Sequence, residues 1–239
     1  MDPRDRFIHR VGKGKSFVDV GGLWGTVNER VSVAHAAGAS SLAMLDLSPL
    51  DGKWWPLFNE RREALGVPPA REISGDLMTL AYTDPTLRFD VVHCSGILYH
   101  IPDQFQLLRA LRTITTGHLV LTSSITETHI VNEAGELHVP EGSALFLPAL
   151  GDAERAVLKA HWWPTLAQHS LGLTTEIDRW ELTDFGPWWW LPTTQALMKM
   201  CEIAGFEVLE VEHLWNGHAA TLMLAARAGE ASRRTPTAA

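Results

Sequence analysis

The chain has 239 residues, a formal net charge of −8 at pH 7 and no basic cluster larger than the pairs Arg61-Arg62 and Arg233-Arg234. This length is sufficient for one α/β domain with an elaboration. A large nucleic-acid interface needs a positively charged surface, so the composition argues against nucleic acid as a partner.

Cysteine content and hydropathy bear on the compartment. Cys94 and Cys201 are the only cysteines, and no spacing of cysteine and histidine is typical of a metal site. No apolar run is long enough to cross a bilayer, and the polar N-terminus lacks the apolar core of a signal peptide. We therefore expect a reduced, cytoplasmic protein without a membrane partner.

The charged, glycine-interrupted residues 1–15 are assigned no element, and the first clear pattern runs from Ser16 to Pro49. A short apolar strand leads to a glycine-rich turn after Val20, apolar residues at helical spacing run from Val27 to Ala37, and a second strand covers Leu42 to Asp46. In such a unit the first turn lies at the carboxyl edge of a parallel sheet, where ligands bind. An acid that ends the second strand can accept both hydroxyls of a ribose.

The glycine-rich turn distinguishes between two kinds of nucleotide site. The dinucleotide fingerprint G-x-G-x-x-G is not matched, because Leu23 and Thr26 stand where glycines are required. Asp19, Gly21 and Gly25 instead resemble motif I of the class I S-adenosylmethionine-dependent methyltransferases, E/D-x-G-x-G-x-G, with Leu23 in place of the middle glycine. The resemblance implies an α/β, Rossmann-like sheet of seven strands whose last strand is antiparallel. It also implies S-adenosyl-L-methionine as cofactor.

Two further segments follow in the order of that family. Arg71 to Leu77 reads as a short third strand and a turn that holds Asp76, the place where family members carry an acid for the adenine amino group. A helix cap or turn residue is the alternative for Asp76. Phe89 to Gly96 is the predicted fourth strand, and the segment FDVVHCSGILYHIPD resembles motif IV and the post-IV segment of small-molecule and transfer-RNA methyltransferases.

The resemblance implies that Tyr99 and His100 lie at the methyl end of the cofactor, and we expect them to be the catalytic residues. A neutral imidazole can accept a proton from an acceptor hydroxyl. The alternative for His100 is that it caps the next helix or is hydrogen-bonded to a neighbouring loop. The resemblance implies cofactor contacts from the ends of four strands, by Asp19, Gly21, Gly22, Gly25, Asp46, Leu47, Asp76, Leu77, Cys94 and Ser95.

After a turn at residues 116–118 and a fifth strand at Leu119 to Ser124, residues 127–191 form an insertion rich in Trp, His and Pro, with a helix predicted over residues 152–161. We expect this insertion to be a lid over an acceptor pocket. Three consecutive tryptophans, 188–190, cannot all face one side, so at least one should line a cavity or an interface, and a homodimer contact stays open. The candidate acceptor residues are His129, His161, Trp163 and Trp189, although a histidine in such a segment is more often a solvated surface residue. Glu127 and His129 alone do not make a cation site, so no metal is expected.

The C-terminal part returns to the α/β pattern. A helix is predicted over residues 193–204, and strands at Glu207 to Leu214 and Thr221 to Ala226 are joined by Asn216-Gly217, a strong hairpin signal. An antiparallel hairpin at the end of a parallel sheet distinguishes methyltransferases of this class from dinucleotide dehydrogenases. The segment from Trp190 to Phe206 is also similar to the transfer-RNA wobble-uridine carboxymethyltransferases. Residues 229–239 are predicted to be a frayed tail.

These patterns predict an enzyme that transfers a methyl group to oxygen or nitrogen of a small acceptor, natural-product or sugar-like, in secondary metabolism. Two alternatives stay open. One is an RNA-modifying methyl- or carboxymethyltransferase, which the negative charge disfavours. The other is a non-catalytic subunit that binds the cofactor, which the substitution of Leu23 for a glycine keeps open.

Overall fold

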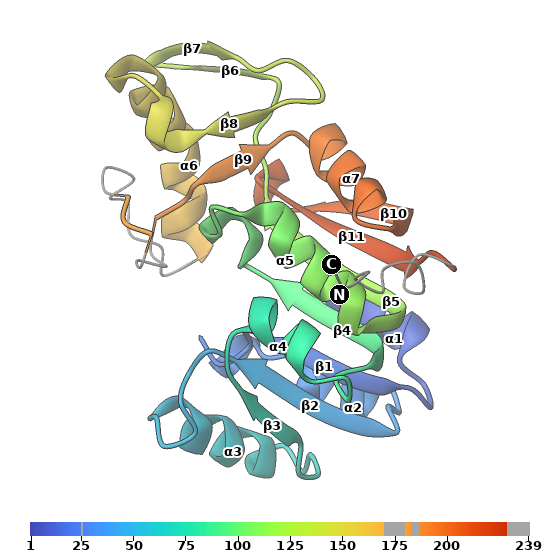
Figure 1. The fold of residues 1–239 in the computed structure, drawn as a ribbon. Coiled ribbons are helices and arrows are strands. Elements are labelled where there is room, and N and C mark those ends of the chain that lie inside the picture. The colour runs from blue at the N-terminus through green and yellow to red at the C-terminus, as the bar shows by residue number, and fades with distance from the viewer. Residues whose placement is uncertain (25, 170–179, 183–186, 229–239) are drawn as a thin grey trace.

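The computed structural model describes residues 1–24, 26–169, 180–182 and 187–228. Its centre is a seven-stranded sheet with the strand order β10-β11-β5-β4-β1-β2-β3 (Figure 1). The strands are β1 (Ser16–Val20), β2 (Ser41–Asp46), β3 (Arg71–Ser74), β4 (Phe89–Ser95), β5 (Thr115–Ser124), β10 (Phe206–Leu214) and β11 (Ala219–Ala226).

Strand direction confirms the predicted sheet. In sheet order, β3, β2, β1, β4 and β5 pair in parallel with one another, whereas β11 is antiparallel to both of its neighbours, β5 and β10. The connection between β10 and β11 is a short 3₁₀ turn, η4 (Trp215–Gly217), in which Asn216 adopts a φ of 57°. The Asn-Gly hairpin expected from the sequence is therefore confirmed at this place.

Helices cover both faces of the sheet. One face packs against α1 (Pro3–Val11), α2 (Val31–Ala36) and α3 (Trp54–Ala64), and the other against α4 (Leu77–Thr83), α5 (Gln104–Ile114) and α7 (Thr194–Ile203). Figure 1 shows the second set in front of the sheet and α1 and α2 behind it. In β1, Phe17 packs toward the first face and Val18 and Val20 toward the second. Because side chains alternate along a strand, Asp19 lies on the face of α1 and α2.

The insertion has elements and a small core of its own. A hairpin is formed by β6 (His129–Asn132) and β7 (Gly135–His138), followed by β8 (Ala144–Phe146), η3 (Leu147–Ala149), α6 (Asp152–His169) and β9 (Trp190–Pro192), which pairs with β8. Figure 1 shows these elements gathered at one end of the sheet. Tyr99, Trp162, Trp188 and aliphatic side chains fill this core. The two ends of the insertion meet, because Thr126 N donates to Pro192 O over 2.9 Å.

Several local predictions were wrong. Residues 3–11 form a helix, in which Asp2 is the N-cap and Phe7 and Ile8 are buried. The helix expected from Val27 begins only at Val31, after the 3₁₀ turn η1 (Thr26–Asn28). The turn expected at residues 116–118 is part of β5.

Along the part of the chain that the structure describes, no helix is both long and apolar enough to span a membrane.

Candidate active site

The loop after β1 leaves little space around its glycines. Gly21 has a φ of +75°, which glycine adopts without strain, and its N–H donates to Leu45 O over 2.8 Å. A Cβ on Gly22 would lie 2.4 Å from Asp19 Oδ2. Leu23 is fully buried among α1, α2 and α3. The residue that replaces the family's middle glycine thus anchors the loop to the core, while Gly25 lies outside the described residues.

Asp19 lies beneath this loop, and each of its carboxylate oxygens has a partner within the protein. Asp19 Oδ1 is 2.7 Å from His93 Nδ1 on the neighbouring strand, and Oδ2 accepts from Arg30 N over 2.7 Å. Both Asp19 and His93 are buried. The carboxylate therefore fixes the start of α2 and the spacing of β1 and β4. These contacts shape the loop that sequence analysis assigned to the cofactor.

Asp46 ends β2 at the same edge of the sheet. Its Oδ2 accepts from Leu23 N over 3.3 Å and its Oδ1 from Ser48 N over 2.9 Å. A carboxylate has about four lone-pair sites, so both oxygens keep acceptor capacity for the hydroxyls of a ribose. The next residue, Leu47, is 52% exposed and can cover a bound ligand.

Asp76 is the N-cap of α4, which is the alternative that the sequence left open. Asp76 Oδ1 accepts from Met78 N over 2.9 Å, and Oδ2 accepts from Thr79 Oγ1 over 3.0 Å. Leu77 is buried in the core on the α4 face. The capping function accounts for this acid without a ligand, and a contact to adenine stays a prediction.

The end of β4 brings in a residue that sequence analysis missed. Cys94 is fully buried, and burial raises the pKa of its thiol far above the ordinary value, so its side chain belongs to the core. The Ser95 hydroxyl accepts from Arg4 Nη1 over 3.3 Å, and Arg4 is in turn paired with Asp2. The first turn of α1 therefore lies over the carboxyl edge of β4. In the sequence, the helix that carries Arg4 is indicated by an N-cap aspartate followed by proline, Asp2-Pro3.

Tyr99 lies in η2 (Leu98–His100), directly after β4. It is buried, its ring centroid is 5.2 Å from that of Trp188, and its carbonyl accepts from Trp189 N over 2.7 Å. Burial raises the pKa of its hydroxyl to about 12, against smaller opposing effects of Ser124 and Arg4. Tyr99 is thus a neutral hydrogen-bond donor at physiological pH and not a base.

His100 is half-buried beside Tyr99, with ring centroids 4.3 Å apart. Its Nδ1 lies 3.1 Å from Pro187 O. A carbonyl oxygen only accepts, so Nδ1 carries the proton and Nε2 is the basic nitrogen of the neutral ring. The structure therefore shows the loop tether that was the alternative for His100, in a tautomer that is also compatible with proton transfer at Nε2.

The four candidate acceptor residues occupy different environments. Trp163 is 53% exposed on α6, and Trp189 is buried beside Phe146, at 6.4 Å between ring centroids. His129 is exposed on β6, where its ring stacks on that of His138 and both Nε2 atoms approach Glu136 Oε1. These three residues are found in three separate settings.

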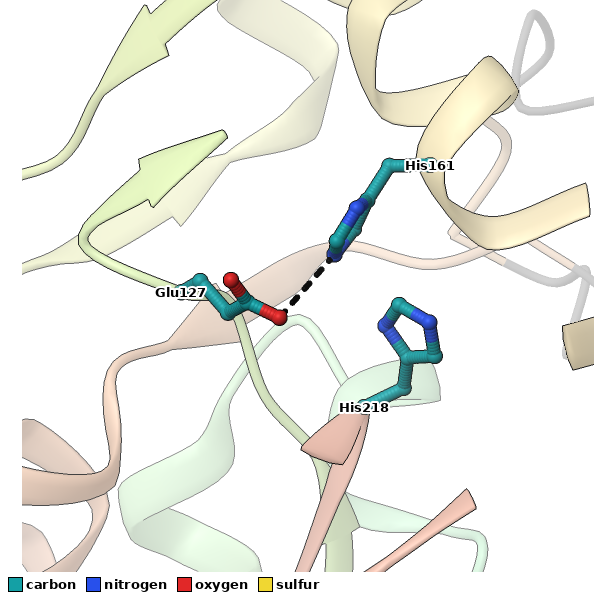
Figure 2. Close-up of side chains that lie close together, drawn as sticks. All are labelled: Glu127, His161 and His218. Atoms are coloured by element: carbon teal, nitrogen blue, oxygen red, sulfur yellow. Dashed lines mark ion pairs between the residues drawn. The ribbon is translucent and has the colours of Figure 1, made fainter. Parts of the chain in front are cut away.

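The fourth candidate, His161, lies in a cluster with Glu127 and His218. In Figure 2 its ring, from α6, points toward Glu127 and His218, which follow β5 and precede β11. His161 Nε2 is 3.6 Å from Glu127 Oε1, and the rings of His161 and His218 are 4.3 Å apart. Burial lowers the pKa of His161, and it lowers that of His218 to about 4 with help from His161. Both rings are therefore neutral at pH 7.

A continuous row of rings connects this group with Tyr99. Trp188 packs on Tyr99 and Trp162, with centroids 5.2 and 4.6 Å apart, and Trp162 packs on His218 at 4.7 Å. The row runs from the end of β4 to the start of β11. It joins the insertion to the edge of the sheet at which the candidate cofactor residues lie.

A family model described as a methyltransferase domain matches residues 2–211. The chain belongs to this family, and the strand order is that of the class I S-adenosylmethionine-dependent methyltransferases. It is therefore a methyltransferase that uses S-adenosylmethionine. No curated protein sequence matches it significantly.

Solved structures show the same fold at low identity. Magnesium protoporphyrin IX methyltransferase from Synechocystis PCC 6803, with bound S-adenosylhomocysteine, superposes with a TM-score of 0.56 at 13% identity, over 93% of this chain and 81% of that one. 1,6-Didemethyltoxoflavin-N1-methyltransferase from Burkholderia thailandensis superposes with a TM-score of 0.56 at 11% identity, over 95% of this chain and 77% of that one. A methyltransferase-like protein from Bacillus halodurans superposes with a TM-score of 0.59 at 14% identity, over 95% of this chain and 100% of that one.

Proposed function

We propose that this protein transfers a methyl group from S-adenosylmethionine to oxygen or nitrogen of a small acceptor, natural-product or sugar-like. The observation that carries the proposal is the row of aromatic rings by which the insertion meets Tyr99 at the end of β4. Aromatic side chains suit flat or sugar-like ligands. The two named structural relatives from Synechocystis and Burkholderia are methyltransferases of small molecules by name, which agrees with this class of acceptor.

The cofactor residues are proposed from the fit of this chain. Bound S-adenosylmethionine would supply a methyl group on a sulfonium, and the protein would hold it. Glycines have no Cβ, so the tight turn at Gly21 and Gly22 would let the backbone come close to a ligand, and the Asp46 carboxylate retains acceptor capacity for ribose hydroxyls. Ser95 and Leu47 flank the same edge, and Asp76 is proposed for the adenine amino group.

For catalysis, the protein must hold donor and acceptor close together and exclude water. A hydroxyl or amine acceptor loses a proton, and His100 Nε2 is proposed as the base, a contribution of about 10²–10⁴-fold. Tyr99 is proposed as a donor that orients the acceptor. The insertion is proposed as the lid that closes this region, and a cytoplasmic location stays a prediction.

The proposal is tested with methyl-labelled S-adenosylmethionine and a panel of phenols, sugars and amines, read by mass spectrometry for the methyl label on each acceptor. Transfer to one class of small acceptor supports the proposal. Labelling of transfer RNA instead would assign the RNA-modifying alternative. Cofactor binding by calorimetry without transfer to any acceptor in the panel or to RNA would favour the non-catalytic alternative.

The lid is tested by a deletion that uses the meeting of its two ends. Replacing residues 127–191 by a short Gly-Ser linker joins Thr126 to Pro192, whose backbones are already hydrogen-bonded. We expect cofactor binding to survive and transfer to be lost. Loss of the fold itself, measured by circular dichroism, would show that the insertion is part of the core.

A further inference from the structure

Glu127, His161 and His218 come from three distant parts of the sequence and meet where the insertion packs on the sheet (Figure 2). Each offers one ligand atom, and these atoms lie within 4.8 Å of one another. A tetrahedral ion with bonds of about 2.0–2.1 Å needs ligand atoms about 3.4 Å apart. The separation of 3.6 Å between His161 Nε2 and Glu127 Oε1 already meets that requirement, and a small movement of side chains brings in His218.

One buried polar atom of this group is left unsatisfied without an ion. His161 Nε2 is inaccessible to solvent and has no hydrogen-bond partner among the residues that the structure describes, and 3.6 Å to the carboxylate is too long for a hydrogen bond. His218 is 7% exposed and packs by its ring against Trp162. A buried polar nitrogen without a partner is costly. A cation bound between the three side chains would remove that cost.

The second histidine group of the insertion provides a contrast. His129, Glu136 and His138 also lie within bonding reach of one ion, but all three are exposed. Both imidazoles already approach Glu136 Oε1, at 2.7 and 2.9 Å. Water reaches all three side chains, and none of their atoms is among the buried atoms that lack a hydrogen-bond partner in the described part of the chain, so this group gives no reason for an ion.

We propose that Glu127, His161 and His218 form a binding site for a divalent first-row transition ion. Among these ions, zinc fits the three side chains best. Two imidazoles and one carboxylate are a common donor set for zinc and for iron(II). Three protein ligands leave at least one coordination position for water or for an oxygen of the acceptor. The proposal concerns binding and does not depend on the proposed methyl transfer.

Such an ion would also join the insertion to the sheet. His161 belongs to α6, whereas Glu127 follows β5 and His218 precedes β11. The ion would thus crosslink the two parts at the end of the aromatic row opposite Tyr99. Because it binds the folded protein only, it should raise the melting temperature.

The test uses protein without a polyhistidine tag, treated with a chelator, dialysed and titrated with Co²⁺ in the absence of S-adenosylmethionine. We expect about one equivalent to bind with the visible absorption bands of a four-coordinate site, and Zn²⁺ to displace it. Glu127→Gln and His161→Ala should weaken binding at least about 10-fold. His138→Ala, in the exposed group, should leave the affinity unchanged.

Glu127→Gln is the decisive variant, because the Glu127 side chain is 48% exposed and the substitution preserves its shape. Circular dichroism of each metal-free variant separates loss of binding from loss of fold. Unchanged affinity in Glu127→Gln and His161→Ala, or a loss confined to His138→Ala, would overturn the proposal. So would the absence of tight Co²⁺ binding by the unaltered protein.

Discussion

Asp19 and His93, on neighbouring strands, approach to 2.7 Å between Oδ1 and Nδ1, and both are buried directly beneath the loop after β1. The same two strands carry a second polar pair at their opposite end, where Asp90 Oδ2 accepts from both N and Oγ of Ser16 over 2.9 Å. The two pairs hold β1 and β4 together by similar means, but only the first lies at the edge with the candidate cofactor residues. This difference makes the pairs a matched test.

Asp19→Asn should lower both the free energy of unfolding and the affinity for S-adenosylmethionine. Hydrogen bonds to a charged group contribute about 1.5–3 kcal/mol each, and Asp19 makes contacts with both His93 and Arg30. Asp90→Asn should destabilise the fold and leave cofactor affinity within about 2-fold of wild type. Urea denaturation and calorimetry measure the two quantities. Equal cofactor affinities in the two variants would contradict the assigned role of Asp19.

Gly22→Ala should destabilise the protein by about 1–3 kcal/mol, the usual cost of overpacking. The added Cβ would lie 2.4 Å from Asp19 Oδ2 and 2.8 Å from Met44 Cε, and Asp19 is held in place by its hydrogen bonds. Gly151→Ala is the control, because its Cβ would meet nothing nearer than 3.6 Å. Thermal melts of both variants decide the matter, and equal melting temperatures would show that the loop has more room than the structure indicates.

Asp46→Ala should weaken S-adenosylmethionine binding by about 1.5–3 kcal/mol, the scale for loss of a charge-assisted hydrogen bond. Asp76→Ser is the companion variant, since serine preserves a helix cap and removes the carboxylate. A loss of affinity in Asp76→Ser at an unchanged melting temperature would support the adenine contact. Calorimetry that finds no loss in Asp46→Ala would rule out Asp46 as the ribose acceptor.

His100→Ala distinguishes a base from a tether. As base, His100 would account for a fall in single-turnover rate of about 10²-fold or more, with cofactor affinity nearly intact. If His100 serves only to hold the loop, by its contact with Pro187 O, the substitution should lower the melting temperature and leave the rate of the folded enzyme within a few-fold. His138→Ala, at an exposed histidine that is not a candidate acceptor residue, serves as control for both measurements. A stable variant with near-normal turnover would remove His100 as the base.

Tyr99 gives the protein a defined sensitivity to alkali. Its pKa is raised from 10.0 to about 12 by burial, so the unfolded chain loses this proton before the folded one does. The stabilisation is complete below about pH 10 and is lost as pH rises toward 12, up to about 3 kcal/mol. Tyr99→Phe should flatten this part of the curve of unfolding free energy against pH. An unchanged slope would mean that the hydroxyl is accessible to water.

The elements that sequence analysis found are those with strong local signals. The turn at Gly21, the strand end at Asp46 and the Asn216-Gly217 hairpin each carry their cause within a few residues. The first helix was missed because its apolar face is short, made by Phe7, Ile8 and the partly buried Val11. Two of its arginines are paired with acids far along the chain, as Arg10 is with Glu210 over 2.6 Å, and no local pattern indicates such a pair.

The acceptor side was harder to predict, because its residues are brought together by tertiary packing. Glu127 was considered with His129, its near neighbour in sequence, but the structure pairs it with His161 and His218. His218 lies at a strand end whose partner in space is the insertion, and no spacing rule connects the two. The buried Trp188 and the exposed Trp163 likewise differ in environment although both belong to short runs of tryptophan.

The backbone contact between Thr126 and Pro192 has an evolutionary consequence. A segment that leaves and rejoins a scaffold at one point can be lengthened, shortened or exchanged without altering the register of the strands on either side. The core of the insertion is largely its own, and the scaffold contributes Tyr99 to it. Descendants of one ancestral gene could therefore have acquired new acceptors by replacing this segment alone, while the part that handles the methyl donor stayed unchanged.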